Sequence, residues 1–558
     1  MAPTSLDACL SDHAIILRSI LADVEMLAGN LPPPPTKSSQ YESVHYNSSN
    51  SSCDAREVAG SIEEQRREAL KDFLDKKNST VDVVRIISSS GDPCAEQVGD
   101  ETEIMLTPLE FKQRYVHRNI PAIVRGLDNE GCSFHNITAL WRKRSRDGKA
   151  SIRWSWFSKN VGGQSIVPVR KPLCQAECTN ACSTSVLDEE GRATECETIE
   201  MSMDQWIEYC QDNRASASNR MEEESRDKLY LKDWHLMQFM ESKEKEKEEE
   251  EATLPGIAIE RKDQSPLYFV PSIFERDILN PFLRKYFGGD FRFVYWGPAS
   301  SSTALHSDVL NTFSWSFNVV GKKEWNFYWS PSFNTSRGEG IREVFNHDAQ
   351  EADEDTLLLS FIQHEGEAVF VPSGWQHDVC NIEETLSVNH NWFTPASTDK
   401  VWECIMTEAK SVEDECNQWG IPSDDWDARE AMLRGCIGLN VSMYFFALLV
   451  SLVQEISLLH GVQAVSQSKV SSDPSECIFN IHRLSNQLLS MLEIPSAADG
   501  DCDQARSVTT YNTQIARRIS ATLMSQELAN RALDLATHVV RWKDEHVIDS
   551  KPLPIPRI

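Results

Sequence analysis

Two histidines and one aspartate in the middle of the chain carry residue types suited to metal chemistry. His306 and Asp308 are two positions apart, so on a β-strand both side chains would point to the same face. His377 follows after a long intervening segment, just beyond the turn sequence Pro372-Ser-Gly374. Two imidazoles and one carboxylate, with other positions left open, form the ligand set of non-haem Fe(II) oxygenases. The sequence therefore predicts that His306, Asp308 and His377 form an iron site.

The residues between these ligands alternate as the strands of a sheet with two different faces should. Apolar side chains, mostly aromatic, occupy every second position of residues 313–319 and again of residues 325–329. Gly321-Lys322 reads as a turn, so we interpret the two runs as a strand and its return strand. Lys323 begins the return strand, where an ammonium could hold the far carboxylate of a dicarboxylic co-substrate. Each residue alone has a plain structural interpretation, and their combination in one segment is what favours a site.

The motifs around these residues are more specific than their spacing. They are Gly297-Pro298, Thr303-x-x-His306-x-Asp308, Gly321-x-Lys323, Val371-Pro-x-Gly-Trp375-x-His377, Asn389-x-Asn391-Trp and, upstream, Leu229-Tyr230-Leu-Lys-Asp-Trp-His235. Together they resemble the JmjC-domain group of 2-oxoglutarate oxygenases, over the segment from Ile104 to Ala396. Within this group the chain is most similar to a lysyl hydroxylase that acts on the eukaryotic peptide-chain release factor.

The resemblance implies a metal and two co-substrates. By this likeness, His306, Asp308 and His377 bind Fe(II), and 2-oxoglutarate and O2 are the co-substrates. One residue departs from the family pattern, since Ser316 stands where some relatives carry an amide side chain. The polar lining near the keto-acid end of the co-substrate is therefore expected to differ from theirs.

The resemblance also implies which residues hold 2-oxoglutarate. Lys323 is expected to pair with its C5 carboxylate, and the hydroxyl groups of Tyr230 and Thr303 to bond to the same carboxylate. Asn389 lies twelve residues after His377, where relatives often have another polar co-substrate contact. Asn391 lies on the same strand face as Asn389 and is included with it.

Three functions are compatible with this site. The first is a protein hydroxylase that acts on a lysine side chain, with a translation release factor as the implied substrate. The second is an N-methyl-lysine demethylase of histones or other proteins, in which the same oxidation removes a methyl group. The absence of a recognisable chromatin-reader motif favours the hydroxylase. The third is a non-catalytic interaction protein on a cupin-like scaffold, because a fold alone does not determine a function.

The predicted fold is α+β. Its core is a double-stranded β-helix, the jelly-roll or cupin-like JmjC architecture, with flanking helices and a C-terminal helical lobe. The predicted divisions are an amphipathic helix (1–29), a largely disordered linker with a short helix (30–103), the JmjC catalytic domain (104–398) with a low-complexity acidic insert (241–253), and a C-terminal helical domain (399–558).

Composition and charge limit the partners. The 558 residues include 55 Lys and Arg against 85 Asp and Glu, a formal net charge of −30, which disfavours direct nucleic-acid binding. The apolar segment Val441–Leu459 is read as a buried helix, so no membrane contact is expected. With no signal peptide visible, the expected location is the cytoplasm, with the nucleus as a second site. The C-terminal helices could form a homodimer.

The cysteines leave two interpretations open. The 15 cysteines of an intracellular chain read as reduced thiols. Cys174, Cys178 and Cys182 recur every four residues, with Cys196 beyond them, and four thiolates could hold a structural zinc ion. Because this spacing is not that of the usual zinc knuckle, reduced thiols are the preferred interpretation.

Overall fold

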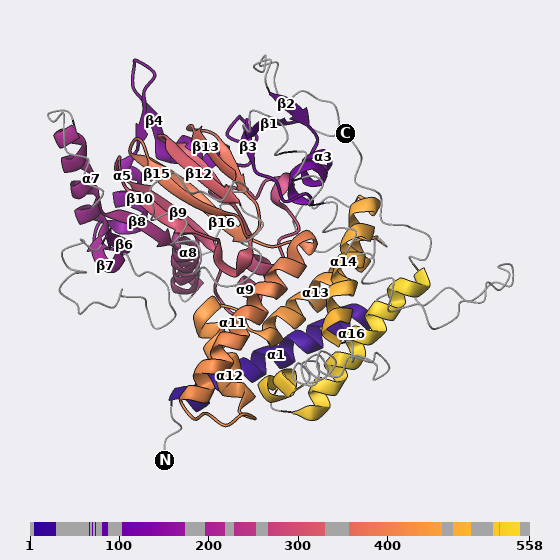
Figure 1. Cartoon of the computed structure of the whole chain (residues 1–558). Coiled ribbons are helices and arrows are strands. Elements are labelled where there is room, and N and C mark those ends of the chain that lie inside the picture. The colour runs from indigo at the N-terminus through magenta and orange to yellow at the C-terminus, as the bar shows by residue number, and fades with distance from the viewer. Residues whose placement is uncertain are drawn as a thin grey trace.

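The chain folds into a β-sandwich and a helical lobe that lie side by side (Figure 1). A computed structural model describes residues 5–29, 66, 70, 73, 81–87, 103–172, 196–217, 228–252, 266–329, 357–459, 473–492, 517–523 and 525–546.

Two sheets form the sandwich. The ten-stranded sheet has the order β2 (Ile104–Leu106), β1 (Asp82–Ile86), β3 (Ala122–Arg125), β14 (Ala368–Val371), β11 (Phe313–Val320), β16 (Thr385–Trp392), β9 (Arg292–Gly297), β8 (Tyr230–Trp234), β6 (Ile166–Pro172) and β7 (Cys196–Ser202). The four-stranded sheet has the order β10 (Ser302–His306), β15 (Gln376–Asn381), β12 (Lys323–Trp329) and β13 (Leu357–Gln363). From β9 to β16 the chain crosses repeatedly from one sheet to the other, which is jelly-roll topology and confirms the predicted fold class.

The two alternating runs of the sequence are strands, but they are not partners. β11 pairs with β14 and β16, whereas β12 pairs with β13 and β15 in the other sheet. Gly321, at φ +87°, carries the chain across, and a Cβ there would lie 2.2 Å from the Glu384 carbonyl oxygen. The interpretation as a strand and its return strand was therefore wrong as a pairing, because alternation identifies faces and not neighbours.

Strand β11 lies at the centre of the molecule, and both of its faces are buried. On its outer face, the Trp315 ring stacks on Phe274 at 5.6 Å and lies 5.3 Å from Phe134. On its inner face, Ser316 and Asn318 are buried and look toward the space between the sheets. This polar inner face in an otherwise apolar core indicates a ligand site.

Helical segments of 3 to 17 residues connect the strands of the sandwich and link it to the lobe. They are α3 (Pro108–Phe111), η1 (Lys112–Val116), α4 (His135–Trp141), α5 (Trp154–Phe157), η2 (Ser158–Gly162), α7 (Met203–Ala217), α8 (Leu236–Ala252), η3 (Ser272–Phe274), α9 (Leu279–Tyr286), η4 (Val309–Asn311) and η6 (Pro395–Ser397), while β4 (Arg142–Arg144) and β5 (Ala150–Ile152) form a separate hairpin.

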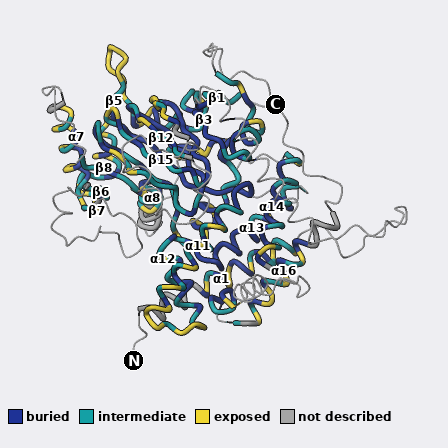
Figure 2. Tube along the Cα trace, viewed as in Figure 1, coloured by how far each residue is buried: buried dark blue, intermediate teal, exposed yellow. Residues whose placement is uncertain are grey.

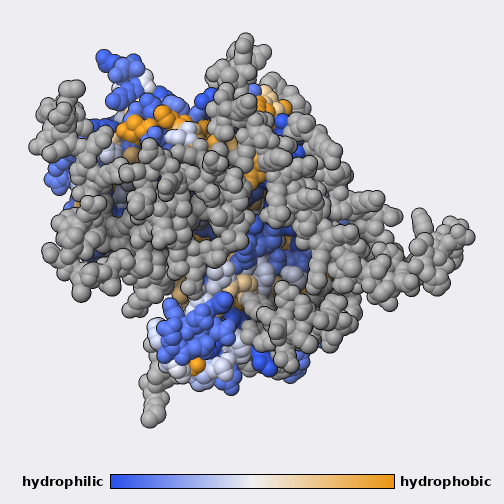
Figure 3. Space-filling view, viewed as in Figure 1, coloured by the Kyte–Doolittle hydropathy of each residue, from blue (hydrophilic) through white to orange (hydrophobic). Residues whose placement is uncertain are grey.

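The helical lobe is built around one apolar helix. Its members are α1 (Ser5–Gly29), α11 (Thr398–Gln418), α12 (Trp426–Ile437), α13 (Val441–Leu459), α14 (Pro474–Leu492) and α16 (Gln526–His546). By length and composition α13 could cross a membrane, but 83% of its most apolar window is buried inside the fold (Figure 2). The visible surface around α12 is hydrophilic (Figure 3). Helix α13 is therefore the core helix of the lobe.

Several predicted segments agree with the structure only in part. The N-terminal helix packs into the C-terminal lobe against α13 and α16, with Leu17, Ile20 and Val24 buried. Most of the predicted linker 30–103 lies outside the described residues, but it contributes strand β1. The acidic insert continues α8 up to Ala252. Three of the four zinc-candidate cysteines, 174, 178 and 182, lie outside the described residues, and Cys196 is the first residue of β7, so the zinc hypothesis stays a prediction.

Candidate active site

The fold brings His306, Asp308 and His377 together between the sheets. His306 ends β10 and lies directly opposite His377 of β15 in the antiparallel register. One potential ligand atom from each residue lies within 4.8 Å of the others. The sequence predicted Asp308 on the same strand as His306. It lies instead beyond the end of β10, at the N-cap of η4, which begins at Val309. The backbone of Asp308 is extended (φ −63°, ψ 146°), and its carboxylate still lies beside the two histidines.

The backbone fixes the orientation of both imidazoles. Nδ1 of His306 lies 2.8 Å from the carbonyl oxygen of Ala304, and Nδ1 of His377 lies 3.2 Å from that of Trp375. A carbonyl oxygen can only accept a hydrogen bond, so each Nδ1 carries the proton and each Nε2 keeps its lone pair. This tautomer is the one that binds metal through Nε2.

The electrostatics of the cluster fit a divalent cation. Burial, with His377 close by, lowers the pKa of His306 to about 3, and burial also lowers the pKa of His377. Both rings are therefore neutral near pH 7 and able to act as ligands. Oδ2 of Asp308 is buried and has no hydrogen-bond partner among the described residues. A buried carboxylate oxygen without a donor is costly unless a cation satisfies it, so the donor set fits Fe(II).

Aromatic rings close one side of this cluster. The ring of Trp325 stacks beside His377 at 5.7 Å, and that of Phe327 meets it edge-on at 5.6 Å. Both rings come from β12, the neighbour of β15. They keep water away from one flank of the metal ligands and lower the local dielectric.

Lys323, the first residue of β12, is a buried cation without a counter-ion in the described chain. Its ammonium is 1% exposed and donates to the hydroxyl of Ser387 at 2.7 Å. Burial, with a further contribution from nearby Lys232, lowers the pKa of Lys323 to about 7. No carboxylate among the described residues forms an ion pair with it, so the site lacks one negative charge. The terminal carboxylate of a dicarboxylic acid would supply that charge.

A row of polar side chains on β16 runs from Lys323 to Thr312, at the end of the loop that carries Asp308. Ser387, Asn389 and Asn391 share the inner face of this strand, and the amide of Asn389 donates to the Ser387 hydroxyl at 3.1 Å. Asn391 lies at the other end of the row, where it donates to Thr312 at 3.2 Å. Of the two predicted asparagines, Asn389 thus belongs to the Lys323 end, and Asn391 lies near the turn that carries Asp308.

The two predicted hydroxyl groups come from strands of different sheets, β8 and β10. Tyr230 on β8 is buried, which raises the pKa of its phenol, and its ring packs against Gly297, where a Cβ would come within 2.7 Å of the ring. Thr303 on β10 is three residues before His306, but their partners on β15 are two residues apart. This β-bulge turns Thr303 and His306 to the same face. Neither hydroxyl bonds to Lys323 among the hydrogen bonds of the described residues.

Sequence reasoning missed three residues of the site. Ser387 was detectable, since it continues the polar alternation of Asn389 and Asn391. Lys232 and Asp233 lie inside the motif of residues 229–235, but their place in the site could not be detected from the sequence. A bulge in β8 places both residues opposite Tyr295. The Lys232 ammonium lies over the Tyr295 ring at 5.7 Å, and the Tyr295 hydroxyl donates to Asp233 at 2.9 Å. Lys232 therefore adds a second positive charge near the metal ligands.

The comparison with known families identifies the class of protein. The family model described as "JmjC domain, hydroxylase" matches residues 293–392, the segment that contains all three candidate metal ligands and Lys323. The chain belongs to the JmjC-domain family of 2-oxoglutarate- and iron-dependent oxygenases. It is therefore an enzyme that uses Fe(II), 2-oxoglutarate and O2, and the non-catalytic alternative is set aside.

Individual proteins of the JmjC family show which members this chain is similar to. The chain is 32% identical over 344 residues to the "2-oxoglutarate and iron-dependent oxygenase JMJD4 homolog" of Drosophila melanogaster, covering 59% of this chain and 72% of the relative. It is 26% identical over 408 residues to the mouse "2-oxoglutarate and iron-dependent oxygenase JMJD4", covering 69% and 82%. It is also 28% identical over 360 residues to the "Arginine-specific demethylase JMJ20" of Arabidopsis thaliana, covering 60% and 66%.

Proposed function

We propose that this enzyme hydroxylates a lysine side chain of a protein substrate, with a translation release factor as the target. The observation that carries the proposal is two sets of unsatisfied buried groups between the sheets. One is the metal-ligand cluster at His377, and the other is the unpaired ammonium of Lys323, which lies opposite Asn381, four residues beyond His377 on β15. The motif resemblance to a release-factor lysyl hydroxylase supports the choice of substrate. A translation factor also accords with the predicted cytoplasmic location.

In this proposal the metal-ligand cluster and Lys323 bind different reactants. His306, Asp308 and His377 hold Fe(II), with Nε2 of each histidine already facing the cluster. Lys323, held by Ser387, pairs with the C5 carboxylate of 2-oxoglutarate.

Further polar groups orient the rest of the co-substrate. Tyr230 and Thr303 offer hydroxyl groups from β8 and β10, and Asn389 and Asn391 offer amides from β16. Ser316 lies opposite Asn389 in the register, and its hydroxyl has no partner among the described residues. A buried hydroxyl without a partner is available to a bound co-substrate.

The chemistry follows from this arrangement. When bound, Fe(II) with 2-oxoglutarate supplies the oxidation in which O2 gives one oxygen atom to succinate, with release of CO2, and the other to the substrate. The residues of the chain bind and orient the reactants and exclude water, with the Trp325 and Phe327 rings as one wall.

Demethylation is the second candidate function, and the Arabidopsis relative named as an arginine-specific demethylase favours it. The two outcomes differ in mass. A hydroxylated lysine gains one oxygen atom, whereas a demethylated residue loses a methyl group as formaldehyde. The same incubation of enzyme and peptide therefore separates them.

The test is mass spectrometry of a recombinant release factor incubated with the enzyme, Fe(II) and 2-oxoglutarate, with succinate measured in parallel. We expect succinate and one added oxygen on a lysine, with both products absent for a His377→Ala variant. Succinate without any modification of the release factor would contradict the proposed substrate. Formaldehyde from a methylated peptide, without hydroxylation, would instead establish the demethylase. The proposed homodimer through the lobe is tested separately by light scattering.

A further inference from the structure

The loop that carries Asp308 has a strained backbone. Leu310 and Asn311, two and three residues after Asp308, adopt left-handed conformations with φ of 58° and 47°. Such conformations are unfavourable for residues other than glycine, and they persist only where surrounding contacts impose them. The position of the Asp308 carboxylate therefore depends on the contacts that hold this loop.

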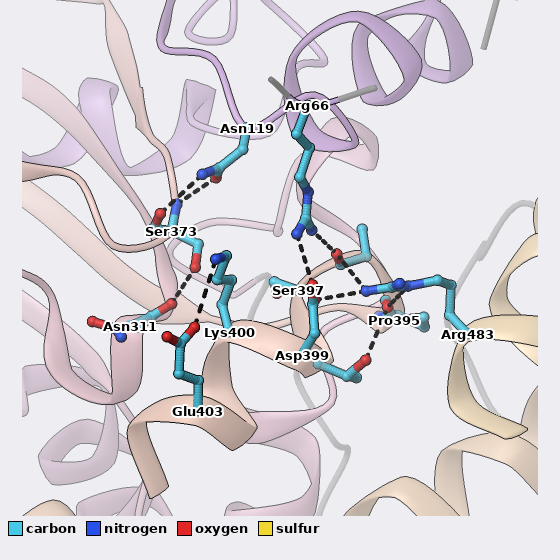
Figure 4. A network of polar contacts seen from close by, with 12 residues as sticks. Arg66, Asn119, Asn311, Ser373, Pro395, Ser397, Asp399, Lys400, Glu403 and Arg483 are labelled. Atoms are coloured by element: carbon cyan, nitrogen blue, oxygen red, sulfur yellow. Dashed lines mark hydrogen bonds and ion pairs between the residues drawn. The ribbon is translucent and has the colours of Figure 1, made fainter. Parts of the chain in front are cut away.

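One of these contacts comes from the turn that precedes His377. The Ser373 hydroxyl, in a side chain that is 4% exposed, donates to the carbonyl oxygen of Asn311 (Figure 4). Ser373 lies four residues before His377, and Asn311 lies three residues after Asp308. This hydrogen bond thus joins the loop that carries Asp308 to the turn that leads into β15 and His377.

Ser373 is itself held by a third segment. The Asn119 side chain donates from Nδ2 to the Ser373 carbonyl oxygen at 2.9 Å and accepts from the Ser373 amide at 2.7 Å (Figure 4). Asn119 follows η1 and has a left-handed φ of 59°, which asparagine tolerates better than most residues. Two bonds from one side chain fix both the position and the direction of the turn.

The far side of the Asp308 loop is anchored elsewhere. The Leu310 side chain is 2% exposed and packs in the core of the helical lobe. Thr312 accepts a hydrogen bond from Asn391 of β16. With these anchors in place, the Ser373 contact decides how far the loop lies from the His377 turn.

We propose that Ser373, oriented by Asn119, is a positioning residue that sets the place of Asp308 relative to His377. The inference rests on the proposed iron site. Ser373 acts through the Asn311 backbone, so its hydroxyl affects metal affinity through the geometry of the ligand set. Partners of this kind typically change metal affinity 10- to 100-fold when they are removed.

The experiment measures binding of Mn(II), as an air-stable probe, to the full chain without 2-oxoglutarate, by electron paramagnetic resonance of the free ion. Ser373→Ala is expected to weaken binding about 10-fold. Ser373→Thr keeps a hydroxyl and is expected to restore affinity. The matched control is Ser457→Ala, which removes a buried serine hydroxyl bonded to the Val453 carbonyl in α13, far from the site, and is expected to leave affinity unchanged.

A second variant protects the test against a simple loss of stability. Asn119→Gly suits the left-handed backbone but removes both bonds to Ser373, so it is expected to weaken Mn(II) binding and to add little to Ser373→Ala. Unchanged affinity in both variants, or an equal loss in Ser457→Ala, would overturn the positioning role. Failure of the wild-type chain to bind Mn(II), with Asp308→Ala behaving identically, would overturn the iron site itself.

Discussion

Two regions of the molecule bury charged side chains, and they do so in opposite ways. At the interface between the sandwich and the lobe, Lys112 pairs with Glu476 at 2.7 Å and Arg276 pairs with Glu455 at 3.0 Å, all four nearly inaccessible. Between the two sheets, Lys323 is equally buried but bonds to a serine hydroxyl and to no carboxylate of the described chain.

This difference separates charges that hold the fold from charges that await a ligand. A paired buried charge is already satisfied, and removing one partner leaves the other exposed to the full desolvation cost. An unpaired one, such as the Lys323 ammonium or the Asp308 carboxylate oxygen, already bears that cost in the free protein, and a ligand of opposite charge removes it. Changes in the interface should therefore affect stability, and changes in the cavity should affect binding.

The largest expected effect is loss of turnover when a metal ligand is removed. His306→Ala takes one imidazole from the cluster and should abolish succinate formation. The free energy of unfolding should change little, because the ring bonds only to the Ala304 carbonyl among the described hydrogen bonds. Succinate release and chemical denaturation measure the two quantities. Retention of activity would show that His306 is not a ligand.

Loss of a charge at the interface between the sandwich and the lobe should instead lower stability and leave binding unchanged. Glu476→Gln leaves Lys112 buried without its carboxylate and should lower the free energy of unfolding by about 3 kcal/mol, with the affinity for 2-oxoglutarate unchanged. The pair of half-buried Lys400 and exposed Glu403, 3.6 Å apart, supplies the control, since Glu403→Gln should cost under about 1 kcal/mol. Equal stability of both variants by urea denaturation would remove the distinction between the regions.

Lys323→Met should weaken binding of 2-oxoglutarate without lowering stability. It removes the charge-assisted bond to the co-substrate and should raise the KM for 2-oxoglutarate at least about 10-fold, the equivalent of about 1.4 kcal/mol or more. The unfolding midpoint should not fall, because the variant no longer buries an unpaired ammonium. A large loss of stability with an unchanged KM would mean that Lys323 is structural.

The smallest expected effect is on pH dependence. Because burial lowers the pKa of Lys323 to about 7, the free enzyme loses this positive charge as the pH rises through 7. A bound carboxylate favours the charged form, so the affinity for 2-oxoglutarate should be highest below pH 7 and fall up to about tenfold per pH unit above it. Titrations between pH 6 and 8.5 measure this slope. The Lys323→Met variant should show none, and a flat wild-type profile would contradict the assignment.

The sequence predicted chemistry better than pairing. His306, Asp308, His377 and Lys323 could be proposed as site residues because few functions require these residue types beside one another in alternating strands, and their roles stay predictions. Their alternation did not reveal that β11 and β12 belong to different sheets, since pairing depends on contacts between distant segments. It also placed Asp308 on the strand, because the following short helix has no clear signal in the sequence.

Other features of the site depend on irregular backbone. Lys232 reaches the cavity through a β-bulge, and Thr303 faces the same way as His306 through another. The link between Ser373 and Asn311 joins residues 62 positions apart in the chain. Neither periodicity nor local propensity reports such contacts, because the tertiary structure creates them.

The most direct test of the account is anaerobic calorimetric titration of 2-oxoglutarate into the Fe(II)-loaded protein. We predict that one molecule binds per chain, that binding weakens about 10-fold or more in Lys323→Met, and that the same titration of Asp308→Ala shows no metal-dependent binding. Binding of equal strength in the wild type and both variants would contradict the central claim that the unpaired groups of this cavity are the co-substrate and metal site.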